Sequence, residues 1–147
     1  MSLSNFDAEN ADNLEDIEKQ FAVKAVQQAE VYWNLITKIP GSKLKLTKYD
    51  EELYEDLVTD FPEFKDAVYI SNIDENELKN HKNKERWRKF CKKWETKIDD
   101  YNFGTLLRTS PKNEYDQDGT IFALRLQFYA FEISRNKMGL NDWAVGK

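Results

Sequence analysis

The two residues best suited to nucleophilic or metal chemistry are the single cysteine and the single histidine of the chain. Cys91 belongs to an apolar helical pattern, whereas His81 lies ten positions earlier in the polar run KNHKNK. A nucleophile needs a base within hydrogen-bond reach, so we expect Cys91 to be inert packing and His81 to face solvent. A structural zinc site takes most of its four ligands from these two residue types, which excludes such a site. The sequence predicts no catalytic residue, no cofactor and no metal.

Carboxylate pairs are the other candidates for chemistry, because two positioned acids can act as general acid and base. The adjacent Glu51 and Glu52 form such a pair, but chance alone produces many in a chain with 27 acidic residues. The run 114–119 resembles the front of a calcium loop, yet Arg125 stands where a bidentate glutamate is needed. We therefore predict that the chain is not an enzyme and that it works by binding another protein.

Length and composition predict one compact domain. The chain has 147 residues, enough for one hydrophobic core, and its 14% aromatic content indicates a packed globule. A net charge of −5 argues against a protein built to neutralise phosphates, so nucleic acid is not an expected partner. The start of the sequence shows neither a signal peptide nor a membrane anchor, and one cysteine allows no internal disulfide. We expect a monomer without a membrane partner, located in the cytoplasm (cytosol) and also in the nucleus.

The first third of the sequence contains the strongest helical pattern. Apolar residues recur at steps of three or four over residues 12–39, which predicts a helix with one buried stripe. Asp12 is the expected N-cap, and Pro40 stops the helix. Residues 1–10 are polar and acidic, so we expect them to form a loose arm.

Three short elements are predicted in the middle of the sequence. Asp50 is the expected cap of a short helix that ends before Pro62. The β-branched and aromatic run 67–73 predicts a short strand or an extended link. Asp74 then opens a short helical turn that carries Leu78.

The second half of the sequence predicts two more helices. The first has its apolar side chains on one face, at Trp87, Phe90, Cys91, Trp94, Ile98 and Tyr101. Residues 110–119 form a turn-rich connection. Residues 120–138 show both strand alternation and helical spacing, and their length favours a helix that ends at Gly139.

Together these elements predict an all-α (mostly helical) fold. A single domain over residues 11–140 is expected to be a bundle of about five helices, with short extended segments. Residues 141–147 form a short C-terminal tail in this prediction.

The charges form two blocks of opposite sign. Residues 49–66 contain eight acids against one lysine, and residues 79–97 contain nine lysines and arginines against two glutamates. We expect the two blocks to complement each other inside the domain. An alternative is a nucleic-acid platform in which Trp87, Phe90 and Trp94 stack on bases. Their common helical face instead favours a place in the core.

Five motifs, in this order and spacing, resemble the polysaccharide biosynthesis domain-containing family: VYWNLI, LKLTKYDEELY, KERWRKFCKKWE, DDYNFGTLLR and IFALRLQFYAFEISRN. The resemblance covers about residues 21–139, and the sequence looks like a fungal member. It implies an orthogonal bundle of helices. For the cytosolic branch it also implies a dedicated chaperone that holds the GTP-binding domain of translation elongation factor 1-alpha near the ribosome. The alternatives are a role related to polysaccharide biosynthesis, suggested by the family name, and an RNA-associated factor.

Two sets of residues are candidates for contact with such a client. Elongation factor 1-alpha is basic, so an acidic set can steer it towards the domain: Glu51, Glu52, Glu55 and Asp56. In a second set, Asn102 and Gly104 break the helical pattern and are expected to display Phe103 and Arg108. The alternative is that Phe103 and its apolar neighbours in this segment fill the core.

Overall fold

The computed structural model describes residues 14–147, with side chains from residue 22 onward. The helices and strands of this part are α1 (Leu14–Ile36), α2 (Asp50–Asp60), α3 (Ala67–Ser71), α4 (Glu75–Leu78), α5 (His81–Trp94), β1 (Gly104–Arg108), β2 (Thr120–Leu124) and α6 (Arg125–Lys137). The fold is therefore mainly helical, as predicted, but it also contains a two-stranded sheet, so it is not purely all-α. The predicted loose arm at 1–10 and the cap at Asp12 lie outside the described residues.

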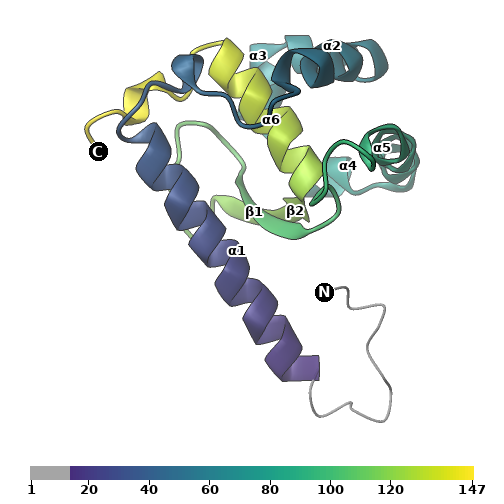
Figure 1. The fold of residues 1–147 in the computed structure, drawn as a ribbon, viewed down its shortest axis with the longest axis horizontal. Helices are drawn as coiled ribbons and strands as arrows, with labels where there is room; N and C mark the ends of the chain where they lie inside the picture. Colours follow the sequence, from purple (N-terminus) through teal and green to yellow (C-terminus); the bar gives the residue numbers. More distant parts are fainter. Residues whose placement is uncertain (1–13) are drawn as a thin grey trace.

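Helix α6 lies at the centre of the domain (Figure 1). It contacts α2 and α3 on one side and both strands on another. Every residue from Leu126 to Asn136 is buried, which is typical of a helix surrounded by other elements. The helix ends as predicted at Gly139, whose φ of 71° suits glycine after a helix. The N–H of Leu140 closes this end by donating to the carbonyl oxygen of Arg135 (2.9 Å).

Helix α1 is a long rod that packs along β1 and extends beyond the rest of the domain (Figure 1). Its buried stripe includes Ala25, Ala29, Tyr32 and Ile36. These positions recur at steps of three and four, so the predicted helical stripe is confirmed for the described side chains.

The prediction of a strand or extended link at residues 67–73 is wrong. Ala67–Ser71 form the short helix α3, because the Asp66 carboxylate accepts a hydrogen bond from the Val68 N–H (2.9 Å) and caps it. Ile70 is buried in the core, and α3 packs against α6. The cap and this packing outweigh the strand preference of the β-branched residues.

The expected helix over residues 120–138 is correct only in part. Thr120–Leu124 form strand β2, which pairs antiparallel with β1 so that Leu106 lies opposite Phe122. The stretch that showed both patterns is thus a strand up to Leu124 and a helix from Arg125 onward. The change occurs at Leu124, whose N–H donates to the side chain of Gln127 (2.9 Å).

Asp50 does not cap α2 in the predicted way. It is the first residue of the helix, and its carboxylate accepts hydrogen bonds from the N–H groups of Leu46 (2.8 Å) and Thr47 (2.7 Å). The side chain thus fixes the connector that precedes the helix. The predicted end of α2 before Pro62 is confirmed.

The aromatic face of α5 lies in the core, as predicted. Trp87 stacks on Phe61 with a centroid distance of 4.3 Å, and Phe90 meets Phe61 edge to face at 5.7 Å. Phe64 links this cluster to α6 through Phe131, 4.6 Å away. These buried rings cannot act as a platform for stacking bases.

Candidate functional site

The acidic helix α2 and the basic helix α5 neutralise each other. The Lys93 Nζ atom lies 2.7 Å from a carboxylate oxygen of Asp56 and 2.6 Å from one of Asp60. Arg86 pairs with Glu63 through both of its terminal nitrogens, at 2.7 and 2.9 Å. The predicted complementarity of the two charge blocks is therefore confirmed.

Three of the four proposed steering acids already have partners inside the domain. Glu51 pairs with Lys137 (2.6 Å), and Glu52 lies 3.5 Å from Lys97. Asp56 also accepts a hydrogen bond from the indole N–H of Trp94 (2.8 Å). Glu55 is exposed and makes no ion pair with another described residue. The steering role of this set stays a prediction, although its free negative charge is smaller than the sequence indicates.

The second candidate set is divided between surface and core. Asn102, Phe103 and Gly104 are exposed, Phe103 by 38%. The expectation that Arg108 is displayed is wrong, because its side chain is 0% exposed. Neighbouring Leu107 is also fully buried, so the segment is displayed at its start and belongs to the core at its end. A partner-binding role for the exposed residues stays a prediction.

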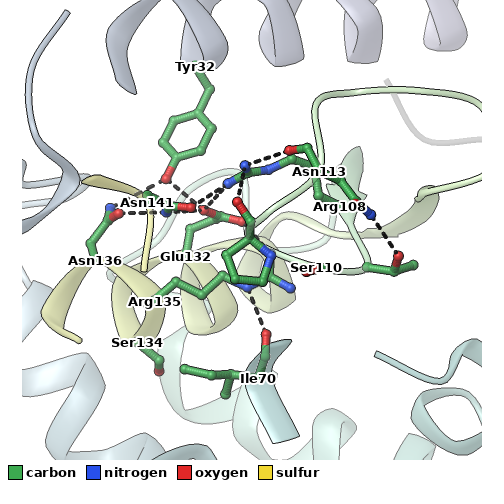
Figure 2. Close-up of polar contacts among 12 residues, drawn as sticks. Tyr32, Ile70, Arg108, Ser110, Asn113, Glu132, Ser134, Arg135, Asn136 and Asn141 are labelled. Atoms are coloured by element: carbon green, nitrogen blue, oxygen red, sulfur yellow. Dashed lines mark hydrogen bonds and ion pairs between the residues drawn. The ribbon is translucent and has the colours of Figure 1, made fainter. Parts of the chain in front are cut away.

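Arg108 belongs to a buried polar network centred on Glu132, which we call the Glu132 network (Figure 2). One carboxylate oxygen of Glu132 lies 3.1 Å from Arg108 and accepts hydrogen bonds from Tyr32 and Asn141, each 2.8 Å long. The other accepts from Arg135 at 2.7 Å. The network thus joins α1, β1, α6 and the C-terminal segment.

Both arginines of the Glu132 network are held by further acceptors. Arg108 donates to the carbonyl oxygens of Pro111 and Asn113, both at 3.0 Å, which fixes the start of the turn-rich connection. The Nε of Arg135 donates to the Ile70 carbonyl of α3 at 2.8 Å (Figure 2). Because each buried charge meets several partners, the network specifies how these elements pack.

The surroundings of Glu132 determine its ionisation. Burial alone raises the pKa of this carboxyl, but Arg108, Arg135 and the hydrogen bonds outweigh that effect and lower the pKa to about 2. Burial and the nearby carboxylate raise the pKa of Tyr32 well above its ordinary value. The tyrosine hydroxyl is therefore protonated and remains a donor.

This ionisation predicts a loss of stability in acid. A carboxyl with a native pKa of about 2 and an ordinary pKa near 4.5 stabilises the fold above pH 4.5, and the effect disappears as the pH falls towards 2. Its full contribution is about 3 kcal/mol, of which about 2 kcal/mol should be lost by pH 3. Urea unfolding at pH 7, 5, 4 and 3 measures this. In a Glu132→Gln variant the free energy of unfolding should depend less steeply on pH. If its pH dependence equalled that of the unaltered protein, the loss of stability in acid would not come from Glu132.

An open apolar groove lies between α5 and the β1–β2 hairpin, with a volume of about 540 Å³. Trp87, Cys91 and Ala123 form buried parts of its wall, and Phe122 stands at its edge with 51% of its surface exposed. We call this the α5–hairpin groove. Among the described residues it is lined by Leu78, Lys79, Lys84, Trp87, Arg88, Cys91, Tyr101, Asn102, Phe122, Ala123, Leu124 and Gln127.

The groove offers binding surface rather than a reactive thiol. Burial raises the pKa of Cys91 to about 11, so the sulfur is a neutral thiol at physiological pH. His81 is exposed at the start of α5. Within residues 14–147, no three His, Cys, Asp or Glu side chains form a group that could hold a metal ion. No helix of this described part is both long and apolar enough to cross a membrane.

The fold and these sites define a small, mainly helical domain with an ion-paired polar centre and an open apolar groove. A family model described as "PBDC1 protein" matches residues 17–146. The chain therefore belongs to the PBDC1 protein family. The older name of this family is polysaccharide biosynthesis domain-containing, so the resemblance of the five sequence motifs is confirmed.

Relatives from yeast and human span most of the chain. "Protein PBDC1 homolog" of Saccharomyces cerevisiae is 63% identical over 145 residues, which cover 99% of each protein. "Protein PBDC1" of Homo sapiens is 42% identical over 134 residues, covering 91% of this chain and 56% of the human protein. A solution NMR structure of a protein from Saccharomyces cerevisiae, 63% identical, matches 98% of this chain and 99% of its own with a TM-score of 0.85.

Proposed function

We propose that this protein is a dedicated chaperone that binds the GTP-binding domain of newly made translation elongation factor 1-alpha. The client is the one that the sequence resemblance implies for the cytosolic branch of the family. The chaperone acts in the cytosol, close to the ribosome, as a monomer.

The α5–hairpin groove is the observation that carries this proposal. A contiguous apolar surface that is open to solvent often marks a site of protein–protein or ligand binding. Phe122 stands at the edge of such a surface, with the buried indole of Trp87 in the same groove. Phe103, also partly exposed, belongs to the segment that leads into the hairpin. An unfinished client domain would present apolar segments of its own to this surface.

Loss of Phe122 should separate binding from folding. In a Phe122→Ser variant we expect the recovery of newly made elongation factor 1-alpha to fall by at least about tenfold, because an aromatic anchor in an apolar groove dominates binding. The measurement is pulse-labelling of cells, followed by capture of the tagged protein and quantification of the labelled factor.

A matched control is available in α3, outside the groove lining. Val68 of α3 is 69% exposed and does not line the groove, so Val68→Ser removes surface apolar area elsewhere. Its recovery of the client should equal that of the unaltered protein, and circular dichroism should show both variants folded. Undiminished recovery by Phe122→Ser would contradict the use of the groove. Absence of the factor from the unaltered sample would contradict the choice of client.

A further inference from the structure

Helix α5 carries cations along two opposite sides of its apolar face. Arg86 and Lys93 are seven residues apart and so lie on one side, where Lys93 meets Asp56 of α2 and Arg86 meets Glu63 just after it. Lys84 and Arg88 are four residues apart and lie on the other side, where both line the α5–hairpin groove. The first pair is used within the fold, whereas the second borders an open surface.

The cations at the groove are not neutralised by another element. Lys79 pairs with Glu75 and Arg88 with Glu85, but both acids lie within one helical turn of their partner, and all four side chains are exposed by more than a third. Exposed pairs of this kind contribute little and are easily exchanged. Lys84 makes no ion pair with another described residue. Three of the groove's described lining residues are cationic and none is acidic.

We propose that the α5–hairpin groove binds an acidic segment with large apolar side chains. Its apolar side chains enter the hollow between Trp87 and Phe122, and its carboxylates face Lys84 and Arg88. A volume of about 540 Å³ holds more than one such side chain. This inference rests on the proposed use of the groove for protein binding, and it names the chemistry of the segment that the groove selects.

The same surface suits nucleic acid less well. Single strands bind through exposed aromatic faces beside a cationic track. Here Trp87 is only 3% exposed and Trp94 only 5%, so neither ring can stack on a base. The apolar hollow adjoining the cations is what a peptide side chain fills.

An unbiased selection tests the proposal. A phage library of random 12-residue peptides is panned on the full-length protein, with removal of phage that also bind Phe122→Ser. We expect the enriched peptides to combine Asp or Glu with Phe, Trp or Leu. Fluorescence anisotropy of one such labelled peptide should show binding that weakens as salt rises from 50 to 300 mM.

Charge reversal at the groove should specifically lower the affinity for the selected peptide. The double variant Lys84→Glu, Arg88→Glu is expected to lose at least about tenfold in affinity, because two attractive charges become repulsive. Lys89→Glu, Lys92→Glu is the matched control, since it makes the same charge change on α5 outside the groove lining. It should lose no more than about twofold.

Several outcomes would overturn the inference. Enrichment of basic or uncharged peptides would do so, as would equal losses in the two double variants. Binding of a single-stranded oligonucleotide that depends on Phe122 would assign the groove to nucleic acid. Self-association abolished by Phe122→Ser would assign it to a second copy. Acidic peptides could fail to bind while elongation factor 1-alpha is still recovered in a way that depends on Phe122. In that case the inference is wrong and the proposed function stands.

Discussion

Replacement of Glu132 by glutamine should lower the free energy of unfolding by about 3–5 kcal/mol. The side chain keeps its size, but its negative charge disappears from a site where Arg108 and Arg135 are both fully buried. Two guanidinium groups then lie together without a counterion, and the amide nitrogen cannot accept the hydrogen bonds that a carboxylate oxygen accepts. Since a domain of this size has a stability of about 5–15 kcal/mol, the loss is a large part of the total.

Urea denaturation monitored by tryptophan fluorescence measures the effect of Glu132→Gln. Glu55→Gln is the matched control, because Glu55 is exposed and has no ion pair with a described residue. Its stability should change by less than about 0.5 kcal/mol. A loss below about 1 kcal/mol for Glu132→Gln would mean that the two arginines find other compensation, and the Glu132 network would not be the polar centre of the fold.

Truncation of Phe64 to alanine should destabilise the domain by about 3–5 kcal/mol. The ring is fully buried and contacts the rings of Phe61, Tyr69, Trp87 and Phe131, with centroid distances from 4.6 to 5.9 Å. These rings come from α3, α5, α6 and the residue that follows α2, so the surrounding structure cannot close over the cavity without moving several of them. The lost burial and the remaining cavity both contribute to the cost.

The same denaturation experiment tests the Phe64 prediction. Val68→Ala serves as its control, because it also shortens an apolar side chain in this region but at an exposed site. We expect a change of less than about 0.5 kcal/mol there. If Phe64→Ala cost no more than Val68→Ala, the aromatic cluster would not form the common core of α3, α5 and α6.

The long helices could be predicted because their signal is local. Ala25, Ala29, Tyr32 and Ile36 recur with the helical period within one short stretch, and the same holds for the aromatic face of α5. Opposite charges in neighbouring blocks were enough to predict the contact between α2 and α5. The hairpin was missed because β1 has no periodic pattern of its own and forms only by pairing with β2.

The Glu132 network could not be predicted from local patterns. An arginine such as Arg108 is ordinarily exposed, and its burial depends on a glutamate 24 positions later in the chain. One signal was present: Glu132 and Arg135 interrupt an otherwise apolar run at a spacing of three, so they share a helix face. The groove was missed for a related reason, because its walls come from separate elements that meet only in the fold.

The wide sequence separation within the Glu132 network affects how the domain acquires its structure. The hydroxyl of Tyr32 and the carboxylate it contacts are 100 positions apart. Asn141, which donates to the same carboxylate, is synthesised later still. Contacts of such high sequence separation slow folding, because a long loop must close before they form. A growing chain that has not reached Asn141 therefore cannot complete the Glu132 network. Helix α1 gains its hydrogen bond to Glu132 only after most of the chain has been synthesised.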